Sequence, residues 1–212
     1  MLKDFFRASE LYKQPEIIEF TTPLPDEKFL RHIPRSVKIL DLGCGYGRTL
    51  KHLFERGYKN LTGVDFSKKL IKRARKHFPY AKYLLSDILS YSPSGKYNFV
   101  LACGILEYFV DPVLRKRLIL KIDSLVDKNG LIYLTSFLRN KKYTPYYQKA
   151  FNDGENWGTI ITKDGLKLFH ASIQEIDKLF KQRFVKKLSR KKQFLTWSGQ
   201  KTSGYICLFS KR

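Results

Sequence analysis

The sequence predicts an α/β fold in which a doubly wound, mostly parallel sheet carries helices on both faces. Short runs rich in β-branched and aliphatic residues alternate with segments of helical periodicity, which is typical of βαβ units. Several of the short runs are nearly continuous in apolar residues, as strands buried on both faces are. The chain has 212 residues, about one domain, and 43% of them are hydrophobic, which is enough for a substantial core.

Five short runs are predicted to be strands of this sheet. The stretches between most of them can hold a helix, and parallel pairing of consecutive strands requires such crossover segments. In chain order the five runs are Val37–Leu42, Asn60–Asp65, Ala81–Leu85, Tyr97–Cys103 and Leu131–Phe137.

Start and stop signals predict helices after the first, second and fourth runs. The first helix is expected to end near Gly57, and the second to begin after a Ser67 N-cap. The third begins at Asp111-Pro112, which supplies an N-cap and a first-turn proline, and Asn129-Gly130 then turns the chain into the fifth strand. The expected apolar faces are Leu50, Leu53 and Phe54, then Leu70, Ile71, Ala74 and Phe78, then Leu114, Leu118, Ile122, Leu125 and Val126.

The alternation ends after residue 138. Residues 139–171 contain several aromatic residues without a clear period, so we expect an irregular insertion there. Ser172 and Glu175 have the spacing of a capping box and open a last helix, with Ile173, Ile176, Leu179 and Phe180 facing inward. Phe184–Phe194 and Tyr205–Ser210 are expected to pair as an antiparallel hairpin, with Ser198–Gly204 as its turn region. Neither a repeat nor a linker divides residues 1–212, so we expect a single domain.

Composition favours a cytoplasmic protein without integral membrane association. The first ten residues, MLKDFFRASE, are charged near their start and lack the apolar stretch of a signal peptide. The longest apolar run, Phe99 to Leu106, is less than half of what a transmembrane helix requires. Cys44, Cys103 and Cys207 are far apart and outside any metal-ligand spacing, which predicts reduced thiols and no metal site.

The chain is strongly basic. A formal charge of +22, from 41 Lys and Arg against 19 Asp and Glu, would attract polyanions such as RNA, DNA or anionic lipid surfaces. The basic residues are spread along the whole length, so a lysine-rich surface that serves solubility explains the charge as well. The charge therefore makes nucleic acid a possible partner without selecting it.

The segment Ile39–Gly47, ILDLGCGYG, carries the most specific chemistry. It joins a strand to three glycines and then to a helix, so a ligand can approach the backbone closely and meet N–H groups at the helix start. A dinucleotide fingerprint needs G-x-G-x-x-G, but Arg48 stands where the third glycine belongs, so NAD is the less favoured cofactor. Asp41 and Asp65 flank the expected crevice, and Asp65 is placed to bind both hydroxyls of a ribose.

This segment resembles motif I of the class I S-adenosylmethionine-dependent methyltransferases, and Gly63–Ser67 (GVDFS) resembles their second motif. Ser86-Asp87-Ile88 is similar to the motif after their third strand, and Phe99–Phe109, with Cys103–Glu107 (CGILE), to motif IV. Asp127–Phe137 is similar to the segment that leads through their fifth strand. Together these motifs cover about residues 36–137 in the family's order and spacing, and the family's Rossmann-like fold has a seven-stranded sheet with an antiparallel C-terminal hairpin.

The resemblance implies roles for individual residues. Those expected at the methionine end of S-adenosyl-L-methionine are Asp41, Gly43, Cys44, Gly45, Gly47, Cys103 and Gly104. Asp65 would bind the ribose hydroxyls, Phe66 would pack on the adenine, and Asp87 and Ile88 would meet its amino edge and ring. Each position also has a structural reading: the glycines permit a tight turn, Asp65 precedes a helix, and Asp87 caps a turn.

The methyl acceptor is not identified by motif. The Asn/Asp-Pro-Pro-Tyr/Phe signature of adenine-type amine methyltransferases is absent from the motif IV segment. That segment resembles members acting on small molecules, lipids or wobble-type tRNA positions, and we favour a small molecule. Glu107 and Tyr108 follow the fourth strand and can face the acceptor, while His170 is either a base or a structural residue. Tyr12 lies in an N-terminal cover segment, residues 1–35, which with residues 139–171 is expected to form a lid.

Methyl transfer from a sulfonium is an in-line displacement, so positioning supplies most of the catalysis and no general base is required by the sequence. Two other functions stay open. One is an RNA methyltransferase of tRNA or rRNA that docks its substrate on the basic segment Lys178–Trp197. The other is a non-catalytic nucleic-acid-binding module on the same fold, although the intact acids and glycines favour an enzyme.

Overall fold

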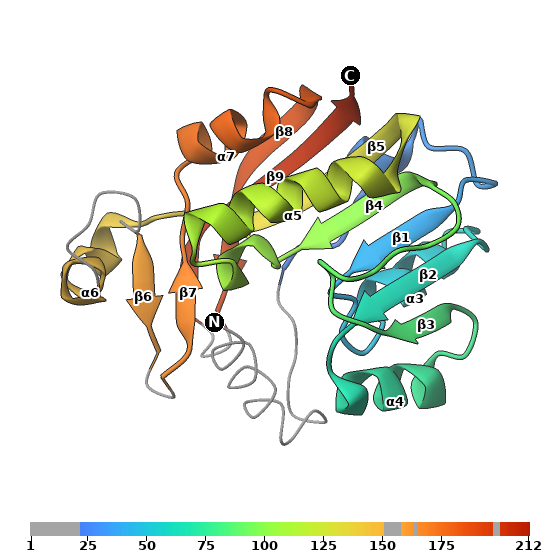
Figure 1. The fold of residues 1–212 in the computed structure, drawn as a ribbon, viewed down its shortest axis with the longest axis horizontal. Helices are drawn as coiled ribbons and strands as arrows, with labels where there is room; N and C mark the ends of the chain where they lie inside the picture. The colour runs from blue at the N-terminus through green and yellow to red at the C-terminus, as the bar shows by residue number, and fades with distance from the viewer. Residues whose placement is uncertain (1–21, 151–157, 163–164, 197–199) are drawn as a thin grey trace.

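A seven-stranded sheet runs through the part of the chain that the computed structural model describes, residues 22–150, 158–162, 165–196 and 200–212 (Figure 1). The strands pair in parallel up to β5, and β9 is antiparallel to both β5 and β8. The predicted fold class and C-terminal hairpin are confirmed. In spatial order the strands are β3 (Lys82–Leu85), β2 (Leu61–Asp65), β1 (Ile39–Leu42), β4 (Tyr97–Cys103), β5 (Val126–Phe137), β9 (Lys201–Lys211) and β8 (Phe184–Leu195).

Three strands begin two or more residues away from their predicted starts. β9 begins at Lys201 and not at Tyr205, because its pairing with β8 continues to Leu195, so residues 201–204 of the expected turn region belong to the strand. β1 begins at Ile39 because the N–H of Val37 donates to the carbonyl of Pro34, which makes a turn there. β5 begins at Val126, which has extended backbone angles and so belongs to the strand, not to the preceding helix. The ladder with β4 then skips residues 127–130, and the turn expected at Asn129-Gly130 is instead a bulge within β5.

Helices cover both faces of the sheet. α5 (Pro112–Leu125) and α7 (Ile173–Phe180) pack on one face, with α5 in front of the sheet in Figure 1. α3 (Arg48–Phe54), α4 (Lys68–His77) and the unpredicted short α2 (Glu27–Leu30) pack on the other. The side chains alternate accordingly, because Leu40 and Leu42 of β1 face α5 while Ile39 faces α2 to α4.

The predicted helix starts are confirmed by their hydrogen bonds. Ser67 accepts from the N–H of Leu70, and Asp111 accepts from the N–H groups of Val113 and Leu114. Ser172 and Glu175 form both halves of the capping box. Each cap satisfies N–H groups that the helix itself leaves unpaired, so these helices begin at well-defined residues.

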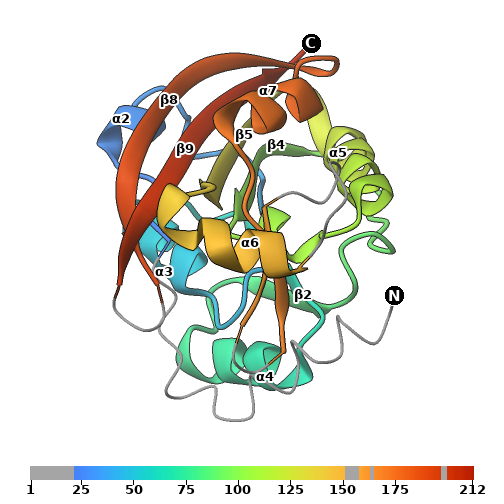
Figure 2. The ribbon, with the colours of Figure 1, turned by 90° about the vertical axis from the view of Figure 1, so that its left-hand side faces the viewer.

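The segment between β5 and α7 is more regular than expected. It contains a 3-10 turn, η2 (Lys141–Tyr143), then α6 (Thr144–Ala150) and an antiparallel pair, β6 (Thr159–Ile161) and β7 (Lys167–Phe169). Figures 1 and 2 show α6, β6 and β7 gathered at one end of the sheet. The prediction of an irregular insertion was wrong here because its aromatic rings pack on one another, as Tyr143 does on Tyr147 and His170, and not on a periodic face.

No helix in the described part of the chain is long and apolar enough to cross a membrane. The three cysteines are free thiols, and the described residues contain no cluster of His, Cys, Asp and Glu suited to a metal ion.

Candidate functional site

A cavity of about 560 Å³ lies at the carboxyl ends of β1, β2 and β4. β1 pairs with β2 on one side and with β4 on the other, so the order in which the strands are added to the sheet reverses at β1. Doubly wound sheets bind ligands at such a switch point. The residues that follow these strands line one end of the cavity. Residues from η1 (Leu106–Tyr108), β5, β6, β7 and the β8–β9 turn region line the rest.

The glycine loop after β1 shapes the first end of the cavity. Gly43 has a φ of +69°, and a Cβ added there would lie 2.6 Å from Cγ2 of Ile105. The N–H groups of Gly43 and Cys44 both donate to the carbonyl of Val64, at 2.8 and 3.0 Å, which holds the loop against β2. Only glycine combines this backbone angle with this close approach, so the loop leaves room beside the strand ends.

Asp65 ends β2 and is 5% exposed. Its Oδ2 accepts the N–H of Gly45 at 2.9 Å, and its Oδ1 accepts the N–H of Ser67 at 2.8 Å. Burial raises the pKa of this carboxyl, and the two backbone donors oppose that shift. Each oxygen keeps a second lone pair, so the carboxylate can accept further hydrogen bonds from a ligand in the cavity.

Asp41, at the end of β1, is 2% exposed and also lines the cavity. Burial raises its pKa to about 8; the guanidinium of Arg48 opposes this shift and the carboxylate of Asp65 adds to it. A positive charge bound nearby would favour the ionised form, because an opposite charge lowers the pKa of a carboxyl. Burial likewise raises the pKa of Cys44 and Cys103, so both are protonated thiols at neutral pH.

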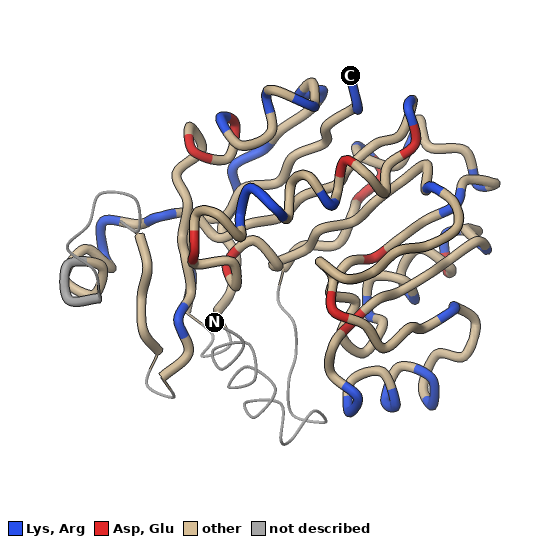
Figure 3. Tube along the Cα trace, in the orientation of Figure 1, with Lys and Arg blue, Asp and Glu red and all other residues tan. Residues whose placement is uncertain are grey.

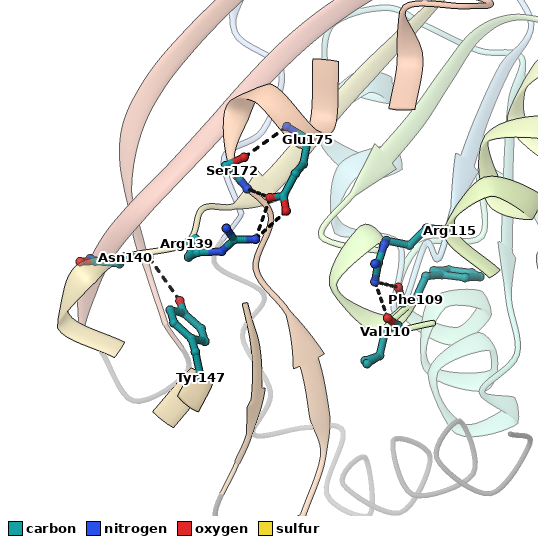
Figure 4. Close-up of polar contacts among 8 residues, drawn as sticks. All are labelled: Phe109, Val110, Arg115, Arg139, Asn140, Tyr147, Ser172 and Glu175. Atoms are coloured by element: carbon teal, nitrogen blue, oxygen red, sulfur yellow. Dashed lines mark hydrogen bonds and ion pairs between the residues drawn. The ribbon is translucent and has the colours of Figure 1, made fainter. Parts of the chain in front are cut away.

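Glu107, in η1 after β4, supplies a third buried acid to the cavity lining. Its Oε1 accepts the N–H of Phe137 at 2.6 Å, and its own N–H and the hydroxyl of Ser136 also stabilise the ionised carboxylate. Burial raises its pKa to about 7. Among the described residues, Arg115 is the one buried Lys or Arg, and its guanidinium donates to the carbonyls of Phe109 and Val110 (Figure 4).

His170 follows β7 and is 7% exposed. Its Nδ1 lies 3.0 Å from the hydroxyl of Tyr147, which accepts the N–H of Asn140 at 3.2 Å (Figure 4). If Tyr147 donates its proton to Nδ1, the ring carries its own proton on Nε2. Burial and the charge of Arg139 lower the pKa of His170 to about 4, so the ring is neutral at pH 7.

The structure brings most of the predicted site residues together in this cavity. Gly45, Gly47 and Asp87 are not part of its lining; Asp87 accepts the N–H groups of Leu89 and Ser90 and so caps its own turn. Tyr12 lies outside the described residues. The predicted residues that do line the cavity are Asp41, Gly43, Cys44, Asp65, Phe66, Ile88, Cys103, Gly104, Glu107, Tyr108 and His170.

Sequence reasoning missed several lining residues. Arg48 directly follows the glycine loop, and its guanidinium donates to the carbonyl and hydroxyl of Thr22, so its position beside the motif was a usable signal. The apolar wall from β6 and β7 gave no signal, because three-residue strands are too short to show a period. The other missed residues are Thr22, Thr49, Ile105, Phe109, Phe137, Tyr143, Tyr146, Ile160, Ile161, Thr162, Leu168, Thr196, Gln200 and Thr202.

Comparisons with known proteins agree with this architecture. Residues 39–130 match the family model described as a methyltransferase domain. A trans-aconitate 2-methyltransferase of Yersinia pestis is 32% identical over 105 residues, which are 48% of this chain and 40% of that enzyme. The chain thus spans less than half the length of the curated relatives it matches.

Solved structures extend the likeness over most of the chain. A SAM-dependent methyltransferase from Methanosarcina mazei has a TM-score of 0.81 at 23% identity, over 89% of this chain and 99% of that one. The 1,6-didemethyltoxoflavin-N1-methyltransferase of Burkholderia thailandensis, solved with S-adenosylhomocysteine, has a TM-score of 0.64 at 16% identity, over 86% and 74%. Residues 39–130 thus match a methyltransferase domain, and the described chain has the fold of the class I S-adenosylmethionine-dependent methyltransferases.

Proposed function

We propose that the protein is a cytoplasmic methyltransferase that transfers the methyl group of S-adenosylmethionine to a small molecule. One observation carries this proposal: a single cavity at the switch point of the sheet is lined by the glycine loop after β1 and by the buried acid that ends β2. When bound, the cofactor supplies an electrophilic methyl group on a sulfonium.

The residues present fit this cofactor. Asp65 keeps lone pairs for both ribose hydroxyls, while Phe66 and Ile88 offer apolar surface for an adenine. The turn capped by Asp87 presents Ile88 to the cavity. At the other side of the glycine loop, the carboxyl of Asp41 suits the positively charged methionine end, where Gly43 and Gly104 leave space.

These residues act mainly by positioning. In-line displacement needs donor and acceptor held about 3 Å apart and aligned, and a buried, closely lined cavity achieves this. Glu107, Tyr108 and His170 also line the cavity and are our candidates for contact with the acceptor. The cavity volume, within the range for small-molecule sites, must hold cofactor and acceptor together, which favours a small acceptor.

Calorimetric titration of the purified chain with S-adenosylmethionine, S-adenosylhomocysteine and NAD tests the cofactor. We expect micromolar binding of the first two and none of NAD, because Arg48 replaces the third glycine that a dinucleotide needs. If the protein is well folded and binds neither adenosyl compound, the proposal is contradicted. The alternative function, a non-catalytic nucleic-acid-binding module, is then the better explanation.

Transfer to RNA is the second candidate, and the edge strand β8 favours it. Lys187, Lys191 and Lys192 of β8 are exposed, close in sequence to the exposed Lys178 and Lys181, and Figure 3 shows basic residues along this strand. Lysine on an edge strand also prevents aggregation, so the same residues have a structural use. Filter binding of tRNA at 50 to 200 mM salt separates the two: an RNA enzyme loses affinity steeply, by about 10³-fold or more.

A further inference from the structure

The exposed face of α4 carries basic side chains without an acid among them. From Phe66 to Ser86 the sequence has seven Lys and Arg and no Asp or Glu. The helix buries Leu70, Ile71 and Ala74, and its other side is left in solvent because a helix repeats every 3.6 residues. Figure 3 shows Lys and Arg, and no acid, along α4. The exposed Lys and Arg of the helix are Lys68, Lys69, Lys72, Arg75 and Lys76.

Acids elsewhere in the fold do not neutralise these charges. Among the described residues, no Lys or Arg of α4 forms an ion pair with an acid. On β8, in contrast, Lys186 is paired with Asp177 at 2.6 Å, and Arg190 is paired with Asp26 at 2.5 Å. A row of unneutralised cations attracts a polyanion, because each phosphate that it meets releases a bound counterion to the solvent. Of the two basic surfaces, α4 therefore suits a polyanion better.

An exposed aromatic ring lies just beyond the carboxyl end of α4. Tyr80 follows Phe78, the C-cap residue, and its ring contacts the rings of Phe78 and Phe54. It stacks on Phe54 with 4.8 Å between the ring centroids and 17° between the planes, so one face of the Tyr80 ring is covered. Tyr80 is nevertheless 63% exposed, which leaves the other face open to solvent. Such a supported ring is a surface on which a nucleic-acid base can stack.

Basic groups also flank this ring. Nζ of Lys59 lies 3.7 Å from the centroid of the Phe54 ring, on which Tyr80 stacks. Lys82 is exposed at the start of β3, two residues after Tyr80. The acid next to Phe54 in sequence, Glu55, is itself in an ion pair with a lysine of α3. Proteins that bind single strands combine cations for the phosphates with rings for the bases, and both occur together here.

We propose that the exposed face of α4 and the ring of Tyr80 form a docking surface for a single strand of nucleic acid. Phosphates lie on Lys69, Lys72 and Lys76, and a base stacks on Tyr80. The ten residues of α4 span about 15 Å, so the strand contacts the helix over a few nucleotides. This binding goes beyond the proposed methyl transfer, because it needs neither cofactor nor acceptor. It is also distinct from β8, since α4 packs beside β3 at one edge of the sheet and β8 is the other edge.

Fluorescence anisotropy of a labelled oligouridylate of about 12 nucleotides tests the charges. Two triple variants of the full chain each lose three exposed lysines, so any difference between them reports where the strand lies and not the net charge. They are Lys69→Ala with Lys72→Ala and Lys76→Ala on α4 and, as the matched control, Lys187→Ala with Lys191→Ala and Lys192→Ala on β8.

The α4 variant should lose about tenfold or more in affinity at about 50 mM salt. The slope of log K against log salt should fall by about 2, because each phosphate contact of a single strand contributes about 0.7 to it. The β8 variant should keep the wild-type slope and stay within about threefold of the wild-type affinity.

Tyr80 tests the contact with a base. Tyr80→Ala should lose about fivefold or more in affinity for the oligouridylate, the lower value for one stacked base. It should lose nothing for an RNA duplex of the same length, whose bases already stack on one another. Tyr80→Phe keeps the ring and should bind as the wild-type protein does. Affinity for S-adenosylhomocysteine should be equal in every variant, because none of the substituted residues lines the cavity.

The outcomes are distinguishable. The docking surface is refuted if the wild-type protein does not bind the oligouridylate, if the α4 and β8 variants lose affinity equally, or if Tyr80→Ala binds as before. Vesicles of phosphatidylglycerol and phosphatidylcholine test a competing occupant: an α4 variant that loses vesicle binding but keeps RNA binding shows that this face binds an anionic membrane instead. Failure of the wild-type protein to bind S-adenosylhomocysteine contradicts the proposed function and leaves the docking surface standing.

Discussion

Replacing Asp65 by alanine separates a ligand-binding role of this acid from a structural one. The carboxylate already accepts the N–H groups of Gly45 and Ser67, so the substitution affects the fold as well as any ligand. Two buried N–H groups would lose their hydrogen-bond acceptor, which lowers the free energy of unfolding by about 1–3 kcal/mol for each group. The variant no longer has to bury a carboxylate, which offsets part of that loss. We expect the free energy of unfolding to fall by about 2–4 kcal/mol.

The expected loss in cofactor affinity is larger than instability alone can explain. Two hydrogen bonds from the ribose hydroxyls to a charged carboxylate are together worth about 3 kcal/mol, or about 100-fold in Kd. Calorimetry with S-adenosylmethionine measures this at 10 °C, where both proteins are folded, and urea denaturation measures the stability change.

Asp111→Ala is the matched control, because this side chain also accepts two backbone N–H groups but lies outside the cavity. Loss of the α5 N-cap should cost about 1 kcal/mol of stability and leave cofactor affinity unchanged. If both variants lose affinity to the same small extent, Asp65 only holds the glycine loop and its assignment to the ribose is refuted.

Three further predictions concern the packing and the buried polar groups of the site. Gly63→Ala would place a Cβ 2.7 Å from Sγ of Cys44 and should cost about 1–3 kcal/mol in urea denaturation, whereas Gly95→Ala, with open space around it, should stay within about 0.5 kcal/mol. The raised pKa of Glu107, about 7 against 4.5, favours its protonated form, so its contribution to stability is complete below pH 4.5 and is lost as the pH rises through 7. Glu107→Gln should therefore remove up to about 3 kcal/mol of that pH dependence between pH 4.5 and 8, and an unchanged profile would show that Glu107 is ionised throughout. Tyr147→Phe leaves the buried imidazole and a backbone N–H without their shared partner and should cost about 1–3 kcal/mol, with no loss if water replaces the hydroxyl.

The half of the chain that carries the sheet's parallel strands was predictable, because its signals are local. Apolar runs predict β1 to β5, and Ser67 and Asp111 cap α4 and α5 as expected. Gly43, Cys44 and Asp65 line the cavity as expected, since a strand end fixes the position of the residues that follow it, whereas Gly45 and Gly47 do not line it. The errors there are boundary shifts, as at Val126, where strand pairing extends an element beyond its apolar run.

The cavity wall from η1, β6 and β7 was not predictable in the same way. The β6–β7 wall depends on how the segment after β5 folds back on the sheet, and the burial of Glu107 is a property of packing, not of composition. His170 could be named as a candidate, but its neutral state follows from burial and from Arg139, neither of which a single sequence displays.

The segment between β5 and α7 is closed at its base. Leu138 pairs with Ala171, the N–H of Arg139 donates to the carbonyl of Ala171, and the guanidinium of Arg139 forms two hydrogen bonds with Glu175 (Figure 4). Because the two ends of the segment already meet, a segment of another length or sequence can in principle take its place, and we call it an exchangeable cassette. The entropic cost of closing such a loop grows only with the logarithm of its length. Residues 140–170 can thus be replaced while residues 39–130, which match the family model, change little. Under the function proposed above, grafting a relative's cassette between Arg139 and Ala171 is accordingly a rational way to exchange one wall of the cavity.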